Sequence, residues 1–376
     1  MRVLLIDQIA KTNFKYSFPL ANGLEKNGAK VTLVLDQKSE KENSTCEIIN
    51  LFTTDEKNIG KIKKVLNYLK SYIRIGKILK KGNYDVIHTQ WYIFSPVDYY
   101  FLSKYKKKYG VKIVSTVHDI LPFNEKFYDK FFHDRLYKIA DKIILQAPSN
   151  MGRFKDIFPA YANKTIMIPH GHTMDYVQVI DKVEARKYLG LDLNKKIFLF
   201  FGQIKKVKGV DILLQAFANV KTNNTDVLLV IAGSVWKTDF SRCEEIIQEY
   251  SLQNDVVLDI RFIPEEDIKY YYSASDICML PYTDVYQSGV IQLAYGYQKP
   301  VIATELPAFT QFVKEGETGY LAKVKDVDSL AAAMEKAIDS SYKWEEMGKN
   351  GHDYIKKTLG WEDITKSIVK NCYMDK

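Results

Sequence analysis

Short apolar runs alternate with longer amphipathic stretches almost from one end of the chain to the other. This alternation predicts repeated strand–helix units, whose strands assemble into parallel sheets. The predicted strands of the first half are 3–6, 31–35, 86–88, 113–117, 143–146 and 165–168. Those of the second half are 197–201, 227–232, 256–260, 277–280 and 301–303. We therefore expect an α/β protein with two series of strands.

A polar stretch without a strand period, residues 169–196, separates the two series. Because 376 residues are enough for two domains, we place one doubly wound domain at residues 1–170 and a second at 171–345. Residues 346–376 have a helical pattern, and we expect this segment to cross back to the first domain. Ligands of such sheets bind beyond the carboxyl ends of the strands, so residues directly after each strand are the first candidates for function.

The composition narrows the class of protein. The chain is 46% hydrophobic, which excludes a disordered or collagen-like chain, and its 54 Lys and Arg against 46 Asp and Glu give a formal charge of +8. Its four cysteines are far apart and form no C-x-x-C pair, so we expect neither a disulfide framework nor a zinc knuckle. No apolar run suits a signal peptide or a spanning helix, so we expect a cytoplasmic protein.

The first candidate site follows the strand 197–201. This strand ends at Gly202, and a basic loop with Lys205, Lys206 and Lys208 leads into a helix pattern that starts at Val210. The backbone amides and the dipole at the start of a helix favour an anion, and a phosphate group suits the added lysines. By spacing alone, a solvated basic loop is an equally good interpretation.

A second candidate site follows the strand 277–280, which leads through Pro281 to Tyr282. After a polar loop, Ser288 is a good N-cap residue, and Gly289 lets a ligand approach the backbone closely. A helix and another strand follow. Two helix starts that suit anions within one domain indicate a diphosphate ligand.

Four motifs carry a family resemblance. The stretches G-x-I-x-x-x-K-G-V-D-x-L-L-x-A-F at 202–217, S-G-V-I-x-L-A-Y-x-x-x-K-P-V-I-A-T at 288–304 and G-x-T-G-Y-L at 316–321 resemble the nucleotide-sugar domain of family 4 glycosyltransferases. V-H-D-I-L-P at 117–122 is similar to a first-domain segment of that family. The resemblance implies the GT-B fold, in which two Rossmann-like domains face a central cleft. It also implies retaining, metal-independent transfer from a UDP- or GDP-sugar bound by the second domain to an acceptor bound by the first.

The resemblance also assigns roles to residues. Lys208 matches a lysine that contacts the donor diphosphate, and Gln203 or Lys205 stands near the place of a second basic residue. The segment 288–290 matches a loop whose amides meet the phosphate and the sugar. His118 matches a histidine that approaches the donor sugar, and Asp119 lies beside it. The implied catalytic residues are His118, Asp119 and Lys208; the implied donor-binding residues are Gly202, Gln203, Lys205, Lys208, Tyr282, Ser288, Gly289 and Val290.

The sequence departs from the family at two glutamates, where it has Tyr286 and either Leu293 or Ala294, and at Gln311. We interpret it as a variant with an S-G-V donor loop. The alternative is a non-catalytic paralogue that binds nucleotide sugars. A nicotinamide-dependent enzyme is disfavoured, because neither Ile6 nor Phe201 is followed by G-x-G-x-x-G.

Catalysis can proceed without those glutamates. If the leaving diphosphate accepts the acceptor's proton on the same face, the reaction needs charge stabilisation and positioning, and we expect Lys208, Lys205 and the amides of 288–290 to supply both. The short D-x-D of Asp326 and Asp328 precedes a helix pattern and is explained by N-capping, so we predict no metal and no cofactor. His88 and His170 also follow or lie in strand-like runs, and each suits a structural role better than a catalytic one.

Residues 57–81 contain nine Lys or Arg and no acidic residue. Their apolar residues recur at helical spacing, which predicts a basic amphipathic helix, or a helix pair interrupted near Gly76. An ordinary surface helix fits the same periodicity, but further lysines at 104–108 favour an anionic membrane surface or a lipid diphosphate acceptor. We expect no nucleic-acid partner, since no binding motif is present. The expectation is a bacterial-type transferase at the inner membrane face, which builds surface polysaccharide on a glycan or a polyprenyl-diphosphate-linked acceptor.

Overall fold

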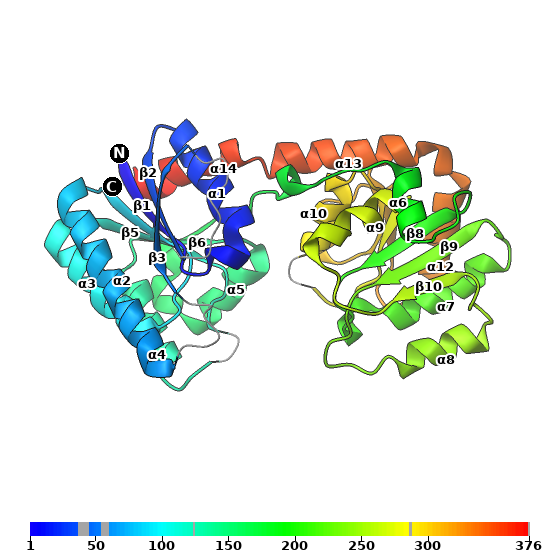
Figure 1. Cartoon of the computed structure of the whole chain (residues 1–376), viewed down its shortest axis with the longest axis horizontal. Helices are drawn as coiled ribbons and strands as arrows, with labels where there is room; N and C mark the ends of the chain where they lie inside the picture. The colour runs from blue at the N-terminus through cyan, green and yellow to red at the C-terminus, as the bar shows by residue number, and fades with distance from the viewer. Residues whose placement is uncertain (37–44, 54–59, 123–124, 286–287, 375–376) are drawn as a thin grey trace. The chain divides into compact units, whose positions relative to one another are not determined.

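The computed structural model describes residues 1–36, 45–53, 60–122, 125–285 and 288–374. Its chain forms two compact units, one of residues 1–171 and 359–376 and the other of residues 172–358 (Figure 1). Each unit contains one parallel sheet with helices around it. The two predicted series of strands thus become two separate sheets.

The first unit has a seven-stranded sheet in the order β3-β2-β1-β4-β5-β6-β7. Its strands are β1 (Arg2–Ile6), β2 (Lys30–Asp36), β3 (Glu47–Phe52), β4 (Val86–Thr89), β5 (Lys112–Val117), β6 (Lys142–Leu145) and β7 (Thr165–Met167). Its helices are α1 (Ala10–Lys26), α2 (Lys61–Gly82), α3 (Ser95–Tyr109), α4 (Asp129–Ile139), α5 (Pro148–Ile157) and α14 (Trp361–Ile368).

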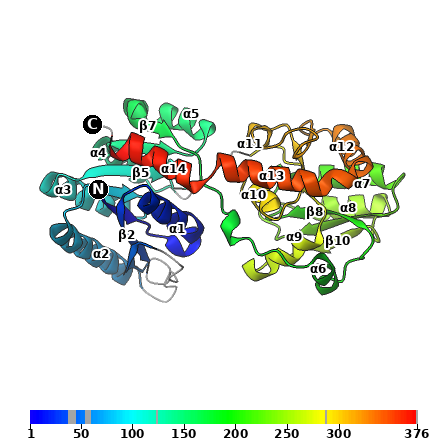
Figure 2. The ribbon, with the colours of Figure 1, turned by 90° about the horizontal axis from the view of Figure 1, so that it is seen from above.

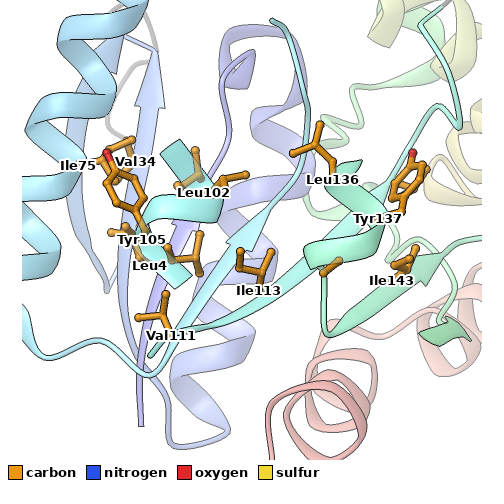
Figure 3. Packing of buried hydrophobic residues seen from close by; sticks show 14 of the residues in the cluster. Leu4, Val34, Ile75, Leu102, Tyr105, Val111, Ile113, Leu136, Tyr137 and Ile143 are labelled. Carbon is orange, nitrogen blue, oxygen red and sulfur yellow. The ribbon is translucent and has the colours of Figure 1, made fainter. Parts of the chain in front are cut away.

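Alternate residues of β1 build the two cores of this unit, because successive side chains of a strand point to opposite faces. Leu4 and Ile6 pack in one cluster with residues of α2, α3, α4 and α5 (Figure 3), and Val3 and Leu5 pack in the other with residues of α1 and α14. Burial of both faces explains why the strands of this sheet are continuous apolar runs.

The second unit has a six-stranded sheet in the order β10-β9-β8-β11-β12-β13. Its strands are β8 (Lys196–Phe201), β9 (Val227–Ala232), β10 (Val256–Asp259), β11 (Ile277–Leu280), β12 (Val301–Thr304) and β13 (Gly319–Ala322). Its helices are α6 (Lys182–Tyr188), α7 (Val210–Lys221), α8 (Ser241–Glu249), α9 (Ile268–Ala274), α10 (Gly289–Gly296), α11 (Pro307–Thr310), α12 (Val327–Asp339) and α13 (Trp344–Thr358).

The C-terminal segment joins the first unit at Leu359, whereas the sequence analysis placed its departure at residue 346. The residues before 359 stay with the second unit because two glycines of α13 allow very close packing. A Cβ on Gly351 would lie 2.1 Å from the Tyr295 ring of α10, and one on Gly348 would lie 1.9 Å from the carbonyl oxygen of Gln298. Only α14 and the residues that follow it pack on the first unit, where α14 lies beside α1 (Figure 2).

Helix α2 runs without a break through Gly76, which confirms the prediction of one helix over this segment and excludes the alternative of a helix pair interrupted there. The glycine has a packing role instead, since a Cβ at Gly76 would lie 3.3 Å from the Tyr105 ring. The part of the predicted basic segment at 57–59 lies outside the described residues. The prediction that Asp326 caps a helix is confirmed, because its carboxylate accepts from the Ser329 amide at the start of α12. Within the described ranges, no helix has the length and apolar character needed to span a bilayer.

Candidate active site

The second unit brings most of the predicted donor-binding residues to the carboxyl ends of β8 and β11. Gly202 follows β8 with a φ of 116°, and Gly233 follows β9 with a φ of 147°. A Cβ on Gly233 would lie 2.0 Å from the carbonyl oxygen of Gly202. Only glycine at Gly233 permits this approach, so the main chains of the two strand ends lie against each other.

Lys208 lies in a short turn between β8 and α7, and it is held there by the glycine that follows. Gly209 has a φ of 63°, and a Cβ on it would lie 2.2 Å from the carbonyl oxygen of Pro281. The turn is also tied to the end of β11, because the Thr283 amide donates to the carbonyl oxygen of Val207 at 2.8 Å. The loop after β8 and the loop after β11 therefore form one structure.

The ammonium of Lys208 lies over the ring of Tyr282, with 3.5 Å between the nitrogen and the ring centroid. Tyr282 is buried, and the Lys208 side chain is partly buried. Burial, together with the nearby charge of Lys205, lowers the pKa of Lys208 to about 8. No carboxylate forms an ion pair with Lys208 in the part of the chain that the structure describes. A partly desolvated cation with no counter-ion is suited to bind an anionic ligand.

The start of α10 lies next to this lysine loop. Ser288 is the N-cap residue, as predicted, but its hydroxyl makes no capping hydrogen bond. Instead this buried hydroxyl lies near the phenol of Tyr282, where it partly offsets the rise in the Tyr282 pKa that burial causes. A Cβ at Gly289 would meet nothing within 4 Å, and a methyl of Val290 would lie 3.7 Å from a Cβ at Gly202. The first turn of α10 therefore lies beside Gly202, at the end of β8.

The remaining residues that the sequence analysis singled out in this unit are not all close to Lys208. Lys205 lies close enough to Lys208 to affect its pKa, whereas Gln203 is exposed to solvent. Ala294 is fully buried and Gln311 donates to the Ala308 carbonyl oxygen, so neither supplies a carboxylate. Tyr286 lies outside the described residues.

His118 follows β5 in the first unit and has a well-defined environment. Its imidazole stacks on Trp91 with ring centroids 4.6 Å apart, and its Nε2 lies 3.0 Å from the side-chain oxygen of Gln90. Since an amide oxygen only accepts, Nε2 carries the proton in this arrangement. Burial, with His170 and His88 nearby, lowers the pKa of His118 to about 3, so the ring is neutral at physiological pH.

A pocket of ≈ 400 Å³ opens beside His118. Asp119 also lines it, and burial raises the pKa of this carboxyl while Arg153 partly offsets the rise. The remaining lining residues come from the segments after β1 and β4, from the end of β5 and the loop after it, and from α4 and the segment just before it. They are Ile9, Gln90, Trp91, Tyr92, Ile93, Thr116, Val117, Pro122, Lys126, Asp129, His133 and Tyr137.

Sequence reasoning missed Gln90 and Trp91, although the rule that function follows strands identifies the segment after β4. It considered His88 in that strand instead. His88 is fully buried between Tyr373 and Thr116, and each of its ring nitrogens lies within hydrogen-bonding distance of one of their hydroxyls. Its role is structural, as expected. Across the residues that the structure describes, no three His, Cys, Asp or Glu side chains are grouped to hold a metal ion.

Known proteins resemble this chain along most of its length. Residues 181–354 match the family Glycosyl transferases group 1, and residues 15–175 match Glycosyltransferase Family 4. Spore coat protein SA of Bacillus subtilis is 24% identical over 322 residues, which are 78% of this chain and 80% of that protein. D-inositol 3-phosphate glycosyltransferase 2 of Catenulispora acidiphila is 21% identical over 307 residues, which are 77% of this chain and 70% of that protein.

Among solved structures, HepE of Anabaena in complex with UDP superimposes with a TM-score of 0.67 and 18% identity, over 98% of this chain and 99% of that chain. The same protein has also been solved with UDP-glucose. This likeness is one of fold.

Proposed function

Because the chain joins a family 4 domain to a group 1 domain and so belongs to the glycosyltransferases of GT-B fold, we propose that it is a retaining hexosyltransferase. The donor is a UDP- or GDP-sugar, and the acceptor is a glycan or a polyprenyl-diphosphate-linked sugar. HepE, which shares the fold, has been solved with UDP and with UDP-glucose, and this supports a nucleotide-sugar donor.

The observation that carries the proposal is the cationic site at the end of β8. The ammonium of Lys208, which has no carboxylate partner among the described residues, lies next to the start of α10, so that a cation and backbone amides converge on the site that we assign to the diphosphate. Lys205 adds charge, and Gly202 and Gly289 let the donor approach the main chain. These groups bind the diphosphate more strongly as it leaves with extra negative charge, which lowers the barrier to transfer.

The proposed chemistry needs no protein nucleophile and no metal. The bond between the sugar's anomeric carbon and the diphosphate oxygen breaks, and the acceptor oxygen bonds to the same face of that carbon. The acceptor's proton passes to the departing diphosphate. His118 and Asp119 line the pocket that we assign to the acceptor, where the neutral imidazole of His118 can make hydrogen bonds to sugar hydroxyls.

We propose that the enzyme works in the cytoplasm, at the inner face of the cell membrane. Helix α2 has no acidic residue, and it exposes Ile62, Leu66 and Ile73 by 80, 50 and 52% beside its lysines. On the neighbouring α3, Tyr100 is exposed beside Lys104, Lys107 and Lys108. An apolar stripe with flanking cations suits an anionic lipid surface, where each nearby basic residue adds about 1 kcal/mol of attraction.

The test is thermal stabilisation by a panel of UDP-, GDP-, ADP- and CMP-sugars, with Lys208→Ala as the control. A shift with one nucleotide that the variant lacks supports the donor site and identifies the base. A shift without any transfer to glycan or lipid-linked acceptors would favour the non-catalytic paralogue, which the missing carboxylates at Ala294 and Gln311 motivate. No shift with any sugar nucleotide contradicts the proposal.

A further inference from the structure

A segment of five residues, 90–94, supplies one wall of the pocket beside His118; we call it the pocket loop. Gln90, Trp91, Tyr92 and Ile93 all line the pocket. Trp91 stacks on His118, and Gln90 is hydrogen-bonded to it. The position of this loop therefore sets both the shape of the pocket and the orientation of the histidine.

Three backbone amides of the pocket loop donate hydrogen bonds to residues outside it. Two of the acceptors are buried side chains. The Gln90 amide donates to the Ile6 carbonyl oxygen at 3.0 Å. The Ile93 amide donates to Oε1 of Gln8 at 3.1 Å, and the Phe94 amide donates to Oδ2 of Asp98 at 3.0 Å. Gln8 and Asp98 are both completely buried.

The same two side chains are bonded to helix α2. The hydroxyls of Tyr68 and Tyr72 lie 2.5 and 2.6 Å from Oδ1 of Asp98, and Nε2 of Gln8 donates to that oxygen at 3.1 Å. Tyr68 also lies 2.8 Å from Oε1 of Gln8. Oδ1 of Asp98 thus faces three donors, two from α2 and one from the segment after β1, while Oδ2 accepts from the pocket loop.

We infer that Asp98 is a positioning residue for the acceptor, because it joins helix α2 to the pocket loop and fixes the wall that carries Gln90 and Trp91. The inference rests on the proposed function, which assigns this pocket to the acceptor. A buried carboxylate is costly to desolvate, and an apolar side chain can fill such a space with little loss of stability. An apolar side chain would make none of the four hydrogen bonds of Asp98, so the carboxylate fixes the pocket loop and α2 in one relative position. Burial raises the pKa of Asp98 to about 6 against the lowering effect of these bonds, so at neutral pH it is a carboxylate able to accept all four.

The variant Asp98→Asn separates the two sides of this junction. Its side-chain oxygen can still accept from the three donors that face Oδ1. Its NH₂ group takes the place of Oδ2 and cannot accept from the Phe94 amide, so the hydrogen bond to the pocket loop is lost. We expect the KM for the acceptor to rise by about tenfold or more, since a charge-assisted bond is lost. The affinity for the donor is expected to stay unchanged, because its predicted site belongs to the other unit.

The assay uses the sugar nucleotide that stabilises the wild type and an octyl glycoside chosen by wild-type turnover. Asp326→Asn makes the same change at the start of α12, in the other unit, and should keep the wild-type acceptor KM. If Asp98→Asn does not fold, Gln8→Asn, whose shorter side chain withdraws from the Ile93 amide, must raise the acceptor KM by itself.

The inference would be overturned if Asp98→Asn kept the wild-type acceptor KM, or if its donor affinity fell by as much as its acceptor KM rose. Neither result would contradict the proposed transferase activity. An inactive wild type would instead contradict the proposed function.

Discussion

Donor affinity should depend on pH through one group, Lys208. Burial and the charge of Lys205 bring its pKa down to about 8 in the free protein. A bound diphosphate is negative and favours the protonated amine, so the pKa rises in the complex. Since the binding-competent form is the protonated one, affinity is full below the free pKa and falls as the pH rises through it.

The magnitude follows from the fraction of Lys208 that carries a proton. With a pKa of about 8, roughly ten elevenths of the molecules are protonated at about pH 7 and one eleventh at about pH 9. The dissociation constant for the donor is therefore expected to rise about tenfold over these two pH units, or about 1.4 kcal/mol. A lysine with its ordinary pKa would produce no such change in this range.

Calorimetric titration of the sugar nucleotide between about pH 6.5 and 9 measures this effect. Lys208→Arg should remove the pH dependence, because a guanidinium stays charged throughout. Lys208→Met keeps an apolar stem over Tyr282 and removes the charge, so it should also be independent of pH and bind roughly 10- to 150-fold more weakly, the loss of 1.5–3 kcal/mol for a charged hydrogen bond. The reasoning is refuted if the wild type binds equally well at both ends of the range, or if Lys208→Met keeps the wild-type slope.

Three further predictions test other parts of the structure. Gly209→Ala and Gly316→Ala both place an alanine at positive φ, which lowers the free energy of unfolding by about 1–2 kcal/mol. In urea unfolding, only Gly209→Ala should show a much larger loss of this free energy. Its Cβ would lie 2.2 Å from a main-chain oxygen, whereas the Cβ at Gly316 would meet nothing within 4 Å. His118→Asn should lower kcat/KM roughly 3- to 10-fold, because a hydrogen bond to a sugar hydroxyl is lost. The pH profile of kcat/KM between about pH 5 and 8 should not change, because the pKa of His118 is already lowered to about 3; a pH-dependent limb that the variant lacks would contradict this. The wild-type protein should sediment with anionic vesicles and not with neutral ones. Reversing the charge at Lys63, Lys64 and Lys70 should lower the fraction of protein that sediments with the anionic vesicles; an unchanged fraction would reject the membrane surface.

The sequence predicts most strands of both sheets because a parallel strand that is buried on both faces is a continuous apolar run. It misses β3 and β13, each of which is an edge strand of its sheet. In β3 the run Glu47–Phe52 has only its last two residues buried, and β13 is four residues long and begins with glycine. Edge position alone does not explain the two misses, because β7 and β10 are edge strands too and the sequence predicts both. The apolar signal is weak in β3 because little of it is buried, and in β13 because the strand is short and begins with glycine.

The two sites differ in how far a sequence can predict them, and the reason is the range of their contacts. The donor site depends largely on one continuous segment, in which Gly202, Lys208 and Gly209 appear in the order that places them in space. The acceptor pocket depends on contacts between residues far apart in the chain: Gln90 with His118, and Gln8 with Asp98, across 28 and 90 positions. A motif can show a local loop, but no periodicity in one sequence shows which buried side chains meet across a sheet. Single substitutions test Lys208 and Asp98 one at a time, but the loss in Gln8→Asn is not expected to add to the loss in Asp98→Asn, because the two side chains share partners in one network.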